Sequence, residues 1–176
     1  MNLIKEFIGI KGRMLHRRIS IPNIRGPEIL DFGCGTGWFL DMISKKGYIL
    51  SGLEVRDEYI NLLKNKYTMY KTTPVDKMFD TICSFSVLNM PNIDEDELKQ
   101  IIEYFKSHAR QRLLIISSIR KDHSNWEQYF EKDKNWKCIY KKCLNGIFFH
   151  YLLKKHQGTR RTYYKDYFYW IYERSD

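Results

Sequence analysis

Short apolar runs alternate with amphipathic stretches along the first two thirds of the chain. The apolar runs are bounded by Gly, Pro or polar residues, which is typical of buried strands. The stretches between them repeat their apolar positions every three to four residues, as helices do. The predicted strands cover residues 28–32, 48–54, 68–72, 80–85 and 113–119, and the predicted helices cover residues 36–46, 57–66 and 95–109. This alternation predicts right-handed βαβ units and a doubly wound α/β fold with a mostly parallel sheet.

The pattern changes beyond the fifth predicted strand. Residues 136–144 and 147–153 have the composition of strands and flank Asn145-Gly146, a dipeptide that favours the tight turn of a hairpin. We therefore expect a C-terminal antiparallel hairpin to complete the sheet. Residues 163–172 contain seven aromatic side chains. They predict a last strand packed against the sheet, and a surface that stacks on a substrate is the alternative.

The N-terminal segment has a different character from the rest of the chain. Residues 1–18 carry apolar side chains at helical spacing, and residues 19–27 have the composition of a linker. We interpret residues 1–27 as a helical flap with its linker and residues 28–176 as one domain, with a helix on a membrane surface as the alternative for the flap. No apolar run has the length of a membrane span and no signal-peptide pattern is present, so we expect a cytoplasmic protein.

The junction after the first predicted strand carries the strongest chemical signal. Residues 29–40 read as a buried strand that ends at Asp31, breaks into three alternating glycines and resumes as a helix near Thr36. Glycines let the backbone turn tightly and approach a ligand closely. The N–H groups and the positive dipole end of the following helix favour a charged ligand above the turn. The junction therefore predicts a binding site for a small charged molecule.

The glycine spacing separates two classes of ligand. A dinucleotide fingerprint needs G-x-G-x-x-G, but position 38, where its third glycine would fall, is Trp38. The observed D-x-G-x-G-x-G resembles motif I of the class I S-adenosylmethionine-dependent methyltransferases. A second strand that ends at Glu54, 23 positions after Asp31, is also similar to that family, as is the segment 79–90, which resembles its fourth strand and trailing loop. The resemblance covers about residues 28–120.

This resemblance implies a Rossmann-like fold, methyltransferase activity and S-adenosylmethionine as cofactor. In the family, the glycine turn meets the carboxylate of the cofactor, the acid after the second strand takes the two ribose hydroxyls, and the loop after the fourth strand faces the transferred methyl group. Asp31 would help to place the ammonium group, and Val55 and Val75 would contact the adenine. The implied cofactor-binding residues are Asp31, Gly33, Cys34, Gly35, Gly37, Glu54, Val55, Val75, Ser84 and Phe85.

The catalytic residues are less well defined by the sequence. Methyl transfer requires a general base only if the acceptor must lose a proton. Asp122 and His123 follow the fifth predicted strand on the ligand side, although a solvated loop pair is the plainer interpretation. Asn89 could position an acceptor or simply end a strand. We interpret the four cysteines as reduced thiols. Because none of them lies in a C-x-x-C pair, we expect no metal site.

Charge gives the last clue to the acceptor. The net charge is +9, with six basic and two acidic side chains in residues 1–28 and eleven and four in residues 132–176. Because no recognition domain is appended to the core, we expect a small or medium-sized acceptor, such as a metabolite or a saccharide. An RNA methyltransferase guided by its basic termini is one alternative. A cofactor-binding subunit without turnover, completed by a partner enzyme, is the other.

Overall fold

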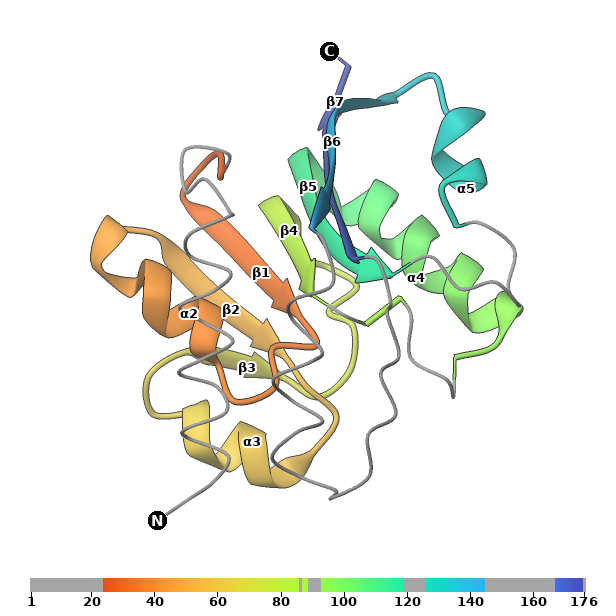
Figure 1. Ribbon diagram of the computed structural model, residues 1–176. Coiled ribbons are helices and arrows are strands. Elements are labelled where there is room, and N and C mark those ends of the chain that lie inside the picture. Colours follow the sequence, from red (N-terminus) through yellow and green to blue (C-terminus); the bar gives the residue numbers. More distant parts are fainter. Residues whose placement is uncertain (1–23, 86, 89–92, 119–125, 145–166, 176) are drawn as a thin grey trace, which may run out of the picture.

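The computed structural model describes residues 24–85, 87–88, 93–118, 126–144 and 167–175. Within these residues, helices and strands alternate up to residue 118 except that two strands follow each other at 68–70 and 79–85, and one short helix and two strands come after residue 118 (Figure 1). The strands are β1 (Glu28–Phe32), β2 (Ile49–Leu53), β3 (Thr68–Tyr70), β4 (Phe79–Phe85), β5 (Ala109–Ser118), β6 (Trp136–Leu144) and β7 (Tyr167–Arg174). The helices are α2 (Trp38–Ile43), continued by the 3-10 turn η2 (Ser44–Lys46), α3 (Asp57–Leu63), α4 (Glu95–His108) and α5 (Gln128–Glu131).

All seven strands belong to one sheet, in the order β3-β2-β1-β4-β5-β7-β6. The five strands from β3 to β5 run parallel, whereas β7 is antiparallel to both β5 and β6. The strand order reverses between β1 and β4, which is the place where sheets of this kind bind ligands beyond the carboxyl ends of their strands. The predicted Rossmann-like, mostly parallel sheet with antiparallel C-terminal strands is therefore confirmed.

Two hydrophobic clusters cover the two faces of the sheet. One contains the buried side chains of α2, which pack on Ile29 of β1 together with Leu63 of α3. The other contains the buried stripe of α4, which packs on Leu30 and Phe32 of the same strand. Successive strand residues point to opposite faces, so a strand buried on both sides reads as a continuous apolar run. This is why the strand positions could be predicted from the sequence.

The last two described strands pair with each other, whereas the predicted hairpin of residues 136–144 and 147–153 stays a prediction. Within the described residues, the partner of β6 is β7, and β7 lies between β5 and β6; residues 145–153, with the predicted turn and second strand, lie outside the described part. Tyr169 and Trp170 of β7 are buried, whereas Ile139 and Tyr140 of β6 are exposed. Aromatic residues buried on both faces require a central strand, so β7 takes the inner position and β6 the edge. The predicted packing of the aromatic segment against the sheet is confirmed at these residues.

Several smaller predictions can also be compared with the structure. The strand β5 begins at Ala109, directly after α4, rather than at residue 113, and the short helix α5 was not predicted. Cys34, Cys83 and Cys138 are free thiols, and burial raises the pKa of the first two. Residues 1–23 lie outside the described part, so the predicted flap stays a prediction. Within the described residues, no helix has the length and apolar character needed to span a membrane.

Candidate functional site

The glycine turn is tied to the neighbouring strand by its own backbone. The N–H groups of Gly33 and Cys34 both donate to the carbonyl oxygen of Leu53 at the end of β2, at 2.9 and 3.0 Å. Gly37 donates to the carbonyl of Cys34 at 3.0 Å, and its own carbonyl accepts the N–H of Asp41 to begin α2. These bonds fix the turn against the carboxyl end of β2. They therefore hold the ends of β1 and β2 together at the switch point of the sheet.

The same bonds correct part of the prediction. The N–H groups of Gly33, Cys34 and Gly37 were expected to meet a ligand carboxylate, but each one donates to a carbonyl within the protein. An N–H group that already donates to a carbonyl has no proton left for a second strong bond. The sequence pattern identified the turn correctly, but it could not show which of its donors the fold itself uses.

The glycines of the turn are required for different reasons. A Cβ at Gly33 would collide with Val87, and a Cβ at Gly37 would lie 2.6 Å from the side chain of Leu63. At Gly35, by contrast, the nearest atom to a Cβ would be the Nη2 of Arg56, 3.9 Å away. Gly33 and Gly37 therefore allow close packing inside the protein. Gly35 faces open space above the turn, which is the arrangement expected where a ligand approaches the backbone.

Glu54 lies beside Gly35, immediately after β2. Its side chain is 4% exposed, and its two carboxylate oxygens accept five hydrogen bonds. The backbone donors are the N–H groups of Gly35 at 2.9 Å, Val55 at 3.0 Å and Arg56 at 3.1 Å. The guanidinium of Arg56 supplies the other two donors, both at 3.0 Å. A buried carboxylate thus stands at the end of β2, directly against the glycine turn.

The protonation state of Glu54 follows from these contacts. Burial alone would raise the pKa of the carboxyl group, but the hydrogen bonds and the charge of Arg56, together with the N–H of Gly35, outweigh it. The pKa of Glu54 is therefore lowered below its usual value of 4.5. The group is an anion at neutral pH and can accept hydrogen bonds from hydroxyl groups. The sequence analysis missed Arg56, although a basic residue two positions after a strand-ending acid was a visible signal.

Two further predicted residues lie at the carboxyl ends of β1 and β4. Asp31 is buried, and its charge helps to raise the pKa of both Cys34 and Cys83. Ser84 is also buried, and its hydroxyl has no hydrogen-bond partner within the part of the chain that the structure describes. A buried hydroxyl without a partner costs free energy, so such a group at a strand end is available to a ligand.

One predicted cofactor contact, that of Val75, is not supported by the structure. Phe85 is 7% exposed and its ring lies 4.7 Å from that of Phe39, inside the cluster under α2, and its contact with the cofactor stays a prediction. The carbonyl of Val75 lies 3.1 Å from the Nε2 of His108, at the last residue of α4. Because α4 runs back from the carboxyl ends to the amino ends of the parallel strands, Val75 lies at the wrong end of the sheet for the glycine turn. Val55, by contrast, directly follows Glu54 and is 67% exposed.

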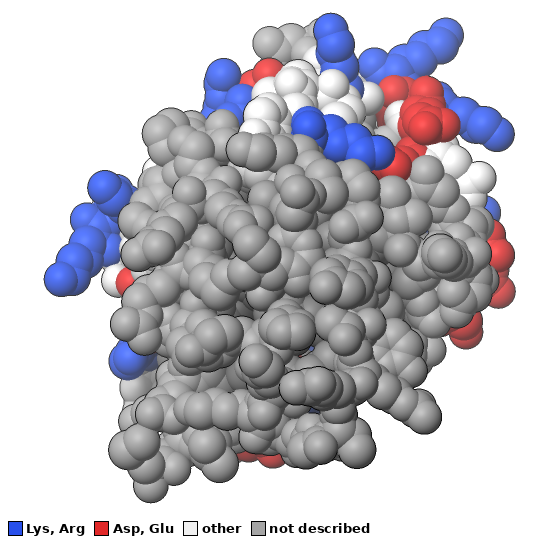
Figure 2. Space-filling view, in the orientation of Figure 1, with Lys and Arg blue, Asp and Glu red and all other residues white. Residues whose placement is uncertain are grey.

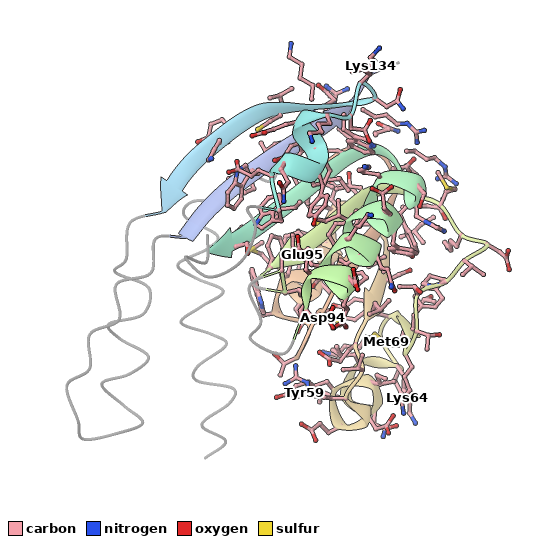
Figure 3. All side chains as sticks on the ribbon, turned by 90° about the vertical axis from the view of Figure 1, so that its right-hand side faces the viewer. Tyr59, Lys64, Met69, Asp94, Glu95 and Lys134 are labelled. Atoms are coloured by element: carbon pink, nitrogen blue, oxygen red, sulfur yellow. The ribbon has the colours of Figure 1, made fainter. Side chains whose placement is uncertain are left out.

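Figure 3 shows the two ends of the sheet from the side. The arrowheads of β5 and β6 point to the side on which Tyr59, at the start of α3, and Asp94 and Glu95, at the start of α4, lie. Lys64 and Lys134 lie on the opposite side. The ligand end is therefore the end where the helices begin. The three catalytic candidates, Asn89, Asp122 and His123, lie outside the described residues.

Comparison with solved structures shows the same architecture in known proteins. The chain is similar to a magnesium protoporphyrin IX methyltransferase from Synechocystis PCC 6803 with bound SAH (TM-score 0.65, 15% identity, 99% of this chain and 88% of the other). It is also similar to a SAM-dependent methyltransferase from Archaeoglobus fulgidus (TM-score 0.63, 15% identity, 96% of this chain and 94% of the other). A third similar structure is the plantazolicin methyltransferase BpumL in complex with SAH (TM-score 0.56, 14% identity, 98% of this chain and 84% of the other). At these identities the likeness shows the fold.

The family is shown by a separate comparison. Residues 11–175 match the family described as "Methyltransferase domain", which covers nearly the whole chain. A search of curated proteins finds no match. The family match agrees with the glycine turn, the acid after β2 and the strand order, all of which the fold brings to one end of the sheet. The chain belongs to the methyltransferase domain family and is a class I S-adenosylmethionine-dependent methyltransferase.

Proposed function

We propose that Glu54 and Gly35 form the centre of the cofactor site. The carboxylate of Glu54 accepts the two ribose hydroxyls of S-adenosylmethionine, and the open space above Gly35 admits the part of the cofactor that crosses the turn. The observation that carries this proposal is the contrast among the three glycines, because only at Gly35 would a Cβ meet no described atom closer than 3.9 Å. The hydrogen bond from the N–H of Gly35 to Glu54 joins the two elements into one site.

The rest of the site is assigned on weaker contacts. Ser84 offers a buried hydroxyl at the end of β4, and the exposed side chain of Val55 is placed to cover the adenine. Asp31 contributes negative charge at the end of β1, which favours the ammonium group of the cofactor. The bound cofactor supplies an activated methyl group. The residues of the protein orient it and exclude water, and Asp122, His123 and Asn89 stay candidates for handling the acceptor.

We propose a small or medium-sized acceptor. Two of the similar structures are named for magnesium protoporphyrin IX and plantazolicin, so this fold accommodates acceptors of that kind. In Figure 2, described Lys and Arg side chains lie around the upper margin, where β6 and β7 lie, beside Asp and Glu. Among the described residues, Lys141 contacts Glu127, and Glu173 contacts Arg25 and Arg112. Most of the basic residues on which the RNA alternative rests, in 1–23 and 145–166, lie outside the described residues, so the labelling experiment below decides between the two acceptor classes.

The acceptor class is tested by transfer of a labelled methyl group. The protein is incubated with S-adenosylmethionine that carries a radioactive methyl group and with fractionated extract of its own cell. We expect label in a small-molecule or glycan fraction. Label confined to RNA, with affinity that falls steeply as salt is added, would instead favour the RNA alternative. No label in any small-molecule or glycan fraction would contradict the proposed acceptor class.

Glu54→Gln tests the ribose contact. The amide keeps the shape of the side chain but loses its charge, so the charge-assisted hydrogen bonds to the hydroxyls weaken. We expect the affinity for S-adenosylhomocysteine (SAH), measured by calorimetry, to fall roughly ten- to hundredfold, which corresponds to about 1.5 to 3 kcal/mol. Glu58→Gln is the control, since it removes the same charge from an exposed residue of α3. Equal affinities for the wild type and Glu54→Gln would refute the ribose contact.

The pH dependence of binding gives a second check on Glu54. Its pKa is lowered in the folded protein, so the carboxylate stays ionised above its usual value of 4.5 and is protonated only as the pH falls further. We therefore expect SAH affinity to be nearly constant from neutral pH down to about pH 4.5 and to decline only below it. Glu54→Gln should lack this decline. A loss of affinity centred at about pH 6 would show that another group, such as a histidine, controls binding.

A further inference from the structure

The guanidinium of Arg56 covers the carboxylate that the cofactor is proposed to use. Its Nε donates to Oε1 of Glu54 and its Nη2 donates to Oε2, both at 3.0 Å. The side chain of Glu54 is 4% exposed, whereas that of Arg56 is 54% exposed. Arg56 therefore lies on the solvent side of the carboxylate. The face of Glu54 that a ligand would reach is the face that Arg56 occupies.

The number of donors shows that this arrangement competes with a ribose. An ionised carboxylate has about four acceptor positions, and Glu54 already accepts five hydrogen bonds. Two hydroxyl groups cannot be added to this set. If the guanidinium leaves, the three backbone donors remain, two on Oε1 and one on Oε2, and each oxygen loses one N–H donor of Arg56. The two O–H groups of a ribose then replace the two N–H groups of Arg56 one for one.

We propose that Arg56 is a displaceable substitute for the ribose diol, which competes with the adenosyl cofactor for Glu54 and lowers its affinity. The inference rests on the proposed ribose contact of Glu54. It assigns a role to a residue outside the family motif and explains how a charged carboxylate is kept satisfied without ligand. Both the methylated and the demethylated cofactor carry the same ribose, so Arg56 weakens the binding of both and promotes release of the product.

The structure also shows why Arg56 can leave at low cost. Arg56 is 54% exposed, so water can solvate the guanidinium once it moves away from Glu54. The guanidinium carbon lies 4.1 Å from the centre of the Tyr59 ring in the paired conformation, and this contact of an exposed side chain is weak. The backbone N–H groups of Gly35, Val55 and Arg56 keep Glu54 in place after the guanidinium moves. Removing the arginine side chain should therefore free the carboxylate without misplacing it.

Calorimetry with SAH tests the competition. Arg56→Gln and Arg56→Ala should both bind SAH about two- to fivefold more tightly than the wild type, the range expected when the competing partner is itself solvent-exposed. The matched control is Lys71→Gln, which removes a positive charge from the exposed ion pair with Asp57 and does not touch Glu54. Its affinity should equal that of the wild type. Weaker binding by both Arg56 variants would overturn the inference, because it would show that Arg56 supports the site.

A double variant separates this inference from the proposed function. In the Glu54→Gln background, Arg56→Gln should no longer tighten binding, because the group for which arginine competes has lost its charge. If Glu54→Gln alone leaves SAH affinity unchanged, the proposed ribose contact fails. If Glu54→Gln weakens binding but Arg56→Gln does not strengthen it, the ribose contact stands and only the competition by Arg56 is refuted.

A pair of nucleosides provides a readout that does not depend on turnover. Adenosine carries the ribose diol and 2′,3′-dideoxyadenosine lacks it, and NMR titration can measure the weak binding of both. The ratio of their affinities should rise about two- to fivefold in Arg56→Gln relative to the wild type, since only adenosine competes with Arg56. An unchanged ratio would overturn the inference, even if both nucleosides bound more tightly, because it would show that the variant altered the adenine contacts instead.

Discussion

Replacing Gly35 by valine is expected to reduce the affinity for SAH roughly a hundredfold or more while the protein stays folded. The side chain would stand in the open space above the turn, where the nearest atom to the new Cβ is 3.9 Å away. It would therefore collide with the cofactor rather than with the protein. Overpacking a well-packed contact costs about 1 to 3 kcal/mol. We expect a cost near the upper end of this range, because the valine side chain is branched and the cofactor lies close to the backbone. Calorimetry with SAH measures the loss.

Backbone strain has to be separated from this steric effect. Gly35 has φ of +56°, a region that costs a non-glycine residue roughly 1 to 2 kcal/mol. Gly47→Ala is the matched control: Gly47 has φ of +76°, and a Cβ there meets nothing within 4 Å. Gly47→Ala should lose a similar amount of stability in a urea titration and keep its affinity for SAH. If Gly35→Val binds SAH normally, the cofactor does not cross the turn at this residue.

Replacing Glu127 by alanine is expected to lower the free energy of unfolding by roughly 2 to 4 kcal/mol. Glu127 precedes α5 and is 9% exposed. Its carboxylate accepts the indole N–H of Trp170 at 2.6 Å and the ammonium group of Lys141 at 2.7 and 2.9 Å. Trp170 is fully buried at the inner strand β7, so loss of this acceptor removes a charge-assisted hydrogen bond from a buried donor.

The contribution of Lys141 to this loss is small, since it is 41% exposed and can be solvated when its partner is removed. Glu131→Ala is the control, because Glu131 is an exposed acid of the same helix. We expect Glu131→Ala to change the free energy of unfolding by less than about 0.5 kcal/mol. Urea unfolding followed by tryptophan fluorescence measures both variants. Equal stabilities of the two variants would show that the contact of Glu127 with Trp170 does not hold α5 to the sheet.

The order and type of the elements from β1 to β5 follow from local patterns. A strand buried on both faces must be apolar at consecutive positions, and α4 must present its apolar residues at a spacing of three or four. Asp94 begins α4 by accepting the N–H of Glu97 at 2.8 Å, a cap that needs only one side chain three positions away. These requirements act within a few residues of the chain. The glycine turn and Glu54 could be located for the same reason.

The positions of β7 and α5 depend on contacts between distant parts of the chain. Burial of Tyr169 and Trp170 on opposite faces of β7 places that strand between β5 and β6. The indole N–H of Trp170 then binds Glu127, 43 positions earlier in the chain, and α5 covers this part of the sheet. Strand order in a sheet is a global property, which a local turn signal cannot determine.

The sequence by itself determined the class of fold, the class of cofactor and the two elements that meet at the site, because each depends on residue types at short and regular spacing. The tertiary structure decided how those elements are used. It showed that the N–H groups of Gly33, Cys34 and Gly37 donate to carbonyl oxygens within the protein. It also showed that Val75 lies at the end of the sheet opposite the glycine turn and that Arg56 covers Glu54. Hydrogen-bond saturation and proximity across the sheet depend on the relative positions of separate segments, which only the folded chain defines.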